Sequence, residues 1–96
     1  MAYFATTYRY VEDAERVSAV RPEHRDYLAR LSAQGGLQIS GPLVGGEPGA
    51  LLVFIAESEA AARELVAADP FVRDGLVAEL TVREWNPVSG AVLDQF

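Results

Sequence analysis

The chain contains one histidine, His24, in the segment RPEH at residues 21–24. Imidazole suits general acid–base catalysis because its unperturbed pKa of about 6.5 lies near physiological pH. His24 stands four residues before Leu28, on the apolar stripe of the helix expected here, so its ring should face the interior rather than solvent. Two interpretations stay open: a group that transfers protons in a cleft, or a histidine that only packs at the rim of the core.

Asp69, in the segment ADPF, is a carboxylate that could work together with His24. A carboxylate that accepts a hydrogen bond from an imidazole fixes the tautomer of the ring and stabilises its protonated form. An aspartate before a proline is equally suited to capping the helical turn that follows. Sequence separation alone does not bring the two side chains together, so both interpretations stay open.

Arg21 and Ser40 are the polar residues nearest to the expected cleft. The planar guanidinium of Arg21 could hold a carboxylate or a developing oxyanion. Ser40 ends a short strand in the segment ISGP, where its hydroxyl could face the cleft or only support the turn. The loop GPLVGGEPG at residues 41–49 lacks the lysine and the strand–helix context of a phosphate-binding loop. It is interpreted as a flexible connection or a lid.

Four segments predict strands around these residues. Aromatic and threonine side chains predict a strand at 2–10, and alternation predicts another at 76–85. The apolar run 50–56 predicts a strand that is covered on both faces. A short strand is expected at 37–40.

Two helices are expected between the strands. The first, at 21–34, would begin with Pro22 at its first position and end at two glycines. Its positive end would favour the neutral form of His24. The second, at 58–68, would be capped by Ser58 and closed before Pro70. The acidic segment EDAER at 12–16 is expected to be a loop or a turn.

The element order β-α-β-β-α-β predicts a ferredoxin-like α+β fold, in which a four-stranded antiparallel sheet carries both helices on one face. We expect a single domain over residues 1–96, with residues 88–96 as a C-terminal extension. The second face of the sheet would be apolar and bare. A homodimer formed through this open sheet face is therefore expected.

Charge and composition argue against several classes of function. The formal net charge is −6, from fourteen acidic residues and eight arginines with no lysine, so no nucleic acid and no anionic membrane is expected as a partner. One histidine and no cysteine argue against a metal site, and no cofactor motif is visible. The first residues do not read as a secretory signal, and the longest apolar run is far too short for a membrane span. We expect a cytoplasmic protein without metal or cofactor.

Three motifs, in this order, resemble those of the YCII-related domain family. They are Arg-Pro-x-His opening a helix, Gly-Pro after the second strand and Asp-Pro-Phe after the second helix, and the resemblance extends from Tyr3 to about Val88. It implies a ferredoxin-like domain that dimerises into an α/β barrel similar to muconolactone isomerase, with a His–Asp pair in the cleft of the dimer. The family also includes a dehydrochlorinase of a chlorinated hydroxyhydroquinone.

By motif position, the resemblance implies that His24 and Asp69 are the catalytic pair. It implies that the pocket is lined or shaped by Arg21, Ser40, Gly41, Pro42, Pro70 and Phe71. The resulting hypothesis is a cofactor-independent enzyme of the lyase or isomerase type, which transfers a proton on a small cyclic or hydroxylated substrate. The alternative is a non-catalytic dimeric module that binds a small-molecule ligand in the same cleft.

Overall fold

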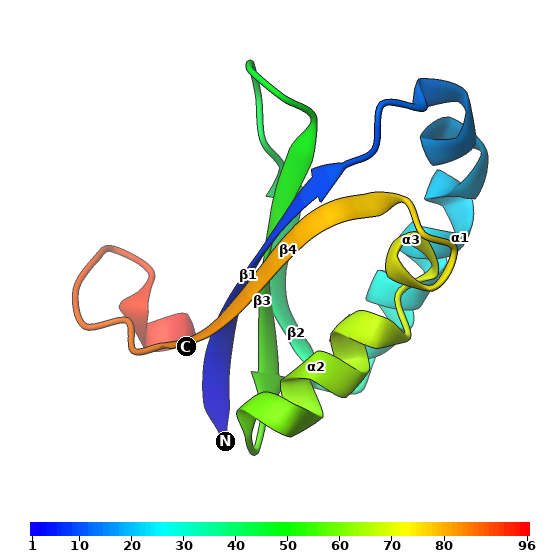
Figure 1. Ribbon diagram of the computed structural model, residues 1–96. Helices are drawn as coiled ribbons and strands as arrows, with labels where there is room; N and C mark the ends of the chain where they lie inside the picture. Colours follow the sequence, from blue (N-terminus) through cyan, green and yellow to red (C-terminus); the bar gives the residue numbers. More distant parts are fainter.

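The strand β1 (Ala2–Tyr10) lies inside the sheet in the computed structural model, which describes residues 1–96. It pairs antiparallel with β3 (Gly49–Ala56) on one side and with β4 (Val77–Trp85) on the other, and β2 (Leu37–Pro42) extends the sheet beyond β3. The strands lie in the order β2-β3-β1-β4, and Figure 1 shows the three α-helices on a single face of the sheet. The predicted ferredoxin-like α+β fold with a four-stranded antiparallel sheet is confirmed.

The first helix, α1 (Ala14–Ala33), begins about two turns earlier than the sequence analysis predicted. The prediction of a loop at 12–16 and of a helix start near Pro22 was wrong. Asp13 caps the helix, because its side chain accepts the backbone N–H of Arg16 at 3.2 Å, and Glu15 adds negative charge to the first turn. None of the helices, α1 included, combines the length and the apolar character that crossing a membrane requires.

Pro22 lies inside α1 instead of at its first position. Proline has no N–H to offer the carbonyl of Ser18, so the helix must be held across this gap by packing. That packing comes from the stripe that faces the interior, namely Val17, His24, Leu28 and Leu31. His24 is thus well inside the helix. The prediction that the positive end of the helix dipole acts on the His24 ring was therefore wrong, because that effect is confined to the first turn of a helix.

Two shorter helices follow β3. Ser58 caps α2 (Glu59–Ala67) by accepting the backbone N–H of Ala61 at 3.1 Å, in agreement with the helix predicted at 58–68. The segment after Asp69 forms the one-turn helix α3 (Pro70–Arg73), which is the helical turn that Asp69 was suited to cap. Pro70 begins α3, where its missing N–H has no cost. Asp69 has the extended backbone, with ψ 127°, that a residue before proline adopts.

Two apolar clusters fill the space between the helices and the sheet. The larger one is built on β1 and β3, where buried side chains such as Phe4 and Phe54 each contribute roughly 2–3 kcal/mol. The smaller one consists of Val17, Phe71 and Leu76, from α1, from α3 and from the residue just before β4. It holds α1 and α3 against each other, and this contact positions the candidate site.

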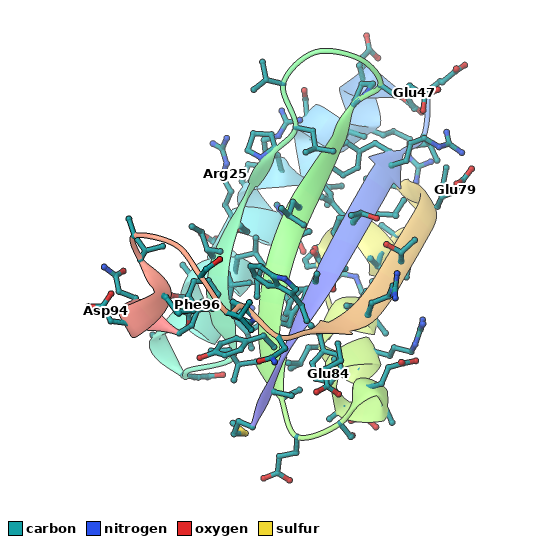
Figure 2. The ribbon with its side chains drawn as sticks, turned by 90° about the vertical axis from the view of Figure 1, so that its left-hand side faces the viewer. Arg25, Glu47, Glu79, Glu84, Asp94 and Phe96 are labelled. Carbon is teal, nitrogen blue, oxygen red and sulfur yellow. The ribbon has the colours of Figure 1, made fainter.

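The opposite face of the sheet carries none of α1, α2 and α3 and is partly covered by the C-terminal residues, which include the short 3₁₀ helix η1 (Leu93–Gln95) (Figure 1). Phe96 makes edge-to-face contacts with Tyr3 and Trp85, with ring centroids 5.1 and 5.6 Å apart, and Figure 2 shows it on this face. Beside these rings, Ile39 and Leu51 are 62% and 43% exposed. Within one chain the open face is therefore apolar and only partly covered: on β3, Val53 is buried whereas Leu51 is exposed.

Candidate active site

Asp69 is a fully buried carboxylate at the start of α3. Its Oδ1 accepts the backbone N–H of Phe71 at 3.0 Å, which caps α3. The same Oδ1 lies 2.8 Å, and Oδ2 3.0 Å, from Nδ1 of His24 on α1. The sequence left open whether Asp69 caps a helix or contacts His24. In the structure the same carboxylate does both.

Tyr8 on β1 supplies a further donor to this carboxylate. Its hydroxyl donates a hydrogen bond to Oδ2 of Asp69 at 2.9 Å. Burial raises the pKa of Tyr8 far above its usual range, and the negative charge of Asp69 and the hydrogen bond to it raise this pKa further. The hydroxyl therefore stays protonated and remains a donor throughout the physiological pH range.

The sequence analysis did not identify Tyr8, although one signal was present. Alternation along residues 2–10 places Tyr8 on the same face as Phe4 and Thr6, and that face is the buried one. A buried tyrosine hydroxyl usually has a hydrogen-bond partner. The identity of that partner could not be predicted, because Asp69 lies 61 residues further along the chain.

Three donors compensate for the removal of the Asp69 carboxylate from water: the N–H of Phe71, the O–H of Tyr8 and Nδ1 of His24. An ionised carboxylate can only accept hydrogen bonds. Nδ1 of His24 must then carry a proton, which assigns the tautomer of the neutral ring. In this tautomer the lone pair is on Nε2.

The ring of His24 is held on two sides and open at Nε2. Phe71 stacks against it, with ring centroids 4.1 Å apart and planes 15° apart, and only 8% of His24 is exposed. Nε2 has no hydrogen-bond partner in the protein, whereas every buried side-chain nitrogen and oxygen has one. Nε2 therefore belongs to the exposed edge of the ring, where an incoming molecule can reach its lone pair.

A hollow of about 230 Å³ lies beside His24, between α1, β2 and β3. Most of the residues that the family resemblance implies for the pocket line it, namely Arg21, Ser40, Gly41, Pro42 and Phe71. Asp69 and Pro70 are not among its lining residues. The other lining residues, which the sequence analysis did not identify, are Tyr10, Arg25, Leu28, Ala50 and Leu52. Asp69 can thus act on a bound molecule only through His24.

A second hollow, of about 500 Å³, adjoins the first and shares Tyr10, Arg21 and Pro42 with it. Residues of the loop 41–49 form one of its walls, so this loop borders the entrance to the site. Burial raises the pKa of Tyr10, and the negative charge of Asp69 raises it further. Tyr10 therefore offers a neutral hydroxyl where the two hollows meet.

This geometry suits proton transfer on a small molecule. Nε2 can take a proton from a molecule in the hollow, and the Asp69 carboxylate stabilises the imidazolium that results. Nowhere in the molecule, this site included, do three or more His, Cys, Asp or Glu side chains come together in the way that a metal ion would require. The chemistry that the site itself can supply is acid–base chemistry.

Comparison with known proteins identifies a domain family and several similar folds. A model of the YCII-related domain matches residues 1–86. Among curated protein sequences, none matches this chain. The structure of 5-chloro-2-hydroxyhydroquinone dehydrochlorinase from Burkholderia phenoliruptrix AC1100, in complex with 2,5-dihydroxybenzoquinone, is similar with a TM-score of 0.77 and 26% identity, over 88% of this chain and 93% of that one.

Two further solved structures are similar in fold alone. An uncharacterised NIPSNAP domain protein from Burkholderia xenovorans has a TM-score of 0.59 at 18% identity, over 95% of this chain and 98% of that one. A protein from Pseudomonas aeruginosa has a TM-score of 0.59 at 13% identity, over 91% of this chain and 93% of that one. The same sheet and helices therefore recur in chains with very different sequences.

Proposed function

Because this chain belongs to the YCII-related domain family, we propose that it is a small-molecule enzyme of the lyase or isomerase type, with His24 as its acid–base group. The observation that carries the proposal is the arrangement around the imidazole. Nδ1 lies 2.8 Å from the buried Asp69 carboxylate, Nε2 has no hydrogen-bond partner in the protein, and His24 lines the hollow of about 230 Å³. A positioned imidazole with a carboxylate behind it moves protons without a cofactor.

Proton transfer at Nε2 accounts for both reaction types. His24 takes a proton from the substrate, and the electron pair of the broken bond forms a new double bond. In an elimination, a leaving group such as chloride departs with its bonding pair, so the net loss is one proton and one chloride. In an isomerisation, the protonated His24 returns the proton to a different atom of the same molecule. Arg21 would stabilise the negative charge that develops on oxygen.

A halogenated ring that carries hydroxyl groups is the substrate class we propose. The similar dehydrochlorinase acts on such a ring according to its name, and its bound 2,5-dihydroxybenzoquinone is a related ring. In this chain, the hollow beside His24 is small, and apolar residues such as Leu28 and Leu52 line it together with the ring of Phe71. These walls suit a flat single ring better than an extended molecule.

Enzyme-dependent release of halide is the expected result for the purified protein. The substrates are 5-chloro-2-hydroxyhydroquinone and its brominated and positional analogues, kept anaerobic so that oxygen does not oxidise them. Ion chromatography measures the halide, and absorbance follows the quinone that forms. The matched control is Arg63→Gln, which removes only an exposed ion pair with Glu59 on α2 and should release halide at the wild-type rate.

Saturable binding of these rings without halide release or rearrangement would overturn the enzymatic proposal. That result would favour the alternative function, a module that binds a small ligand in the same hollow without changing it. Neither outcome depends on identifying a natural substrate, because both are measured on the same set of compounds.

We also propose that two chains associate through the open sheet face. A groove of about 540 Å³ on this face is lined by sheet residues, including Ile39, Leu51 and Val53, and by residues of the segment 85–96. Exposed apolar patches of this kind mark association sites, and identical chains most often pair through one shared face. Residues 88–96 would take part as an extension beyond the family domain. The cytoplasmic location and the absence of a nucleic-acid partner stay predictions.

Light scattering coupled to size-exclusion chromatography should give the mass of two chains for the wild type. Leu51→Glu places a charge on the open face and should give the mass of one chain, because burying an unpaired charge is costly. Arg63→Gln, on the helical side of the molecule, should leave the mass unchanged. A wild-type mass of one chain at high protein concentration would contradict the proposed dimer.

A further inference from the structure

The hollow beside His24 carries positive charge inside a protein that is otherwise acidic. Its only residues with a permanent charge are Arg21 and Arg25, and no aspartate or glutamate lines it. The chain as a whole has fourteen acidic residues and a net charge of −6. Figure 2 shows Arg25 on α1, beside the edge of the sheet at β2. A local positive potential in an acidic protein attracts negatively charged molecules to that place.

Neither arginine is neutralised by a carboxylate of the protein. Ion pairs with carboxylates are made by Arg9, Arg63 and Arg73. The only hydrogen bond of the Arg21 side chain is a 3.5 Å contact with the Ser18 hydroxyl, and the Arg25 side chain makes none. Both guanidinium groups are therefore available to a ligand.

The spacing of Arg21 and Arg25 makes an anion between them favourable. The two residues are four positions apart on α1, where like charges are neighbours on the helix surface and repel each other. His24 lies between them in the sequence and lines the same hollow. A negatively charged group bound here would relieve this repulsion and lie close to Nε2.

The adjoining hollow has the opposite character. Its lining includes Glu12, Asp13 and Glu47, and its additional arginine, Arg9, is already paired with Glu47 and Glu79. Acidic walls repel an anion, so a negatively charged ring is directed toward the His24 side. The two hollows thus differ in the charge that they accept.

We infer that Arg21 and Arg25 make this site selective for small flat rings that carry an ionised oxygen, such as a phenolate, a carboxylate or the enolate of a hydroxyquinone. This inference rests on the proposed function and names the charge state of its substrate. The planar fork of a guanidinium fits two oxygens of such an anion. Arg25 is a specificity-determining residue that the family motifs do not include.

Equilibrium binding measured by calorimetry at pH 7 tests this selectivity without any turnover. The anionic probe is 2,5-dihydroxybenzoquinone, whose two acidic hydroxyls are ionised at this pH, and the neutral probe is 2,5-dimethoxybenzoquinone. Arg21→Gln and Arg25→Gln should each weaken binding of the anion by roughly tenfold, because each loses a charge-assisted hydrogen bond. Binding of the neutral ring should change by less than about twofold, since no such bond is lost.

Arg30→Gln is the matched control, because Arg30 is an exposed arginine on the same helix that lines neither hollow. It removes the same charge and should leave both affinities at the wild-type value. Equal weakening by Arg25→Gln and Arg30→Gln, or equal wild-type affinity for the two probes, would overturn the inference. Halide release without charge selectivity would defeat the inference and leave the enzymatic proposal standing. Selective anion binding without turnover would do the reverse.

Discussion

Replacing His24 with glutamine should lower halide release by about 10²–10⁴-fold, which is the range that general acid–base catalysis contributes. Glutamine can donate its amide N–H to Asp69 and so keep the contact that Nδ1 makes. It has no group with a pKa near neutrality and therefore cannot take the proton from the substrate. The measurement is the initial rate of halide release at saturating substrate, compared with the wild type.

Binding and stability measurements on the same His24→Gln variant separate a catalytic role from a structural one. The affinity for 2,5-dihydroxybenzoquinone should fall by no more than a few-fold, since the arginines remain. The urea midpoint should stay close to that of the wild type. A loss of about 1–2 kcal/mol, the cost of a broken hydrogen bond, together with full turnover per folded molecule, would assign His24 a purely structural role.

Replacing Asp69 with alanine should destabilise the fold by about 3–5 kcal/mol, the usual cost of removing one partner from a buried polar cluster. The variant leaves Tyr8, the backbone N–H of Phe71 and Nδ1 of His24 without their acceptor, in a region closed to water. A small domain has a total stability of about 5–15 kcal/mol, so this is a large part of it. Urea denaturation followed by circular dichroism measures the change.

Two milder variants keep this prediction testable if Asp69→Ala does not fold. Tyr8→Phe removes one donor and should cost only about 1–2 kcal/mol. Asp69→Asn keeps the shape and an oxygen for the cap, but its amide can donate to Nδ1 and so leave the proton on Nε2. Loss of turnover by about 10²–10⁴-fold with the fold retained is then expected. An Asp69→Ala variant as stable as Tyr8→Phe would contradict the central position of the carboxylate.

The arrangement of strands and helices could be predicted because most of its signals are local. Ser58 precedes a run of strong helix formers, so the start of α2 was visible in a few residues. The start of α1 was not, because Pro22 imitates a first helical position and the acidic residues before it resemble a loop. Val17, seven residues before His24 on the same face, was the signal that the helix begins earlier.

The candidate site could be predicted only in part, because its contacts join distant segments. The order of three short motifs pointed to His24 and Asp69, whereas Tyr8 reaches Asp69 only once β1 and α3 are packed together. Arg25 has the appearance of an ordinary polar residue on a helix. Its importance depends on which residues of β2 and β3 lie opposite, and sheet topology determines this.

The aromatic contact at the C-terminus gives the molecule a built-in optical reporter. Trp85 is the only tryptophan, and it lies against Phe96 and lines the groove of the open sheet face, on the side away from His24. The emission wavelength of Trp85 depends on how much water surrounds the indole, and a second chain that covers this face would remove water from it. Fluorescence of this one chromophore would therefore report the proposed association of the chains through the open face, whereas a ligand bound at His24 would lie on the other face of the sheet.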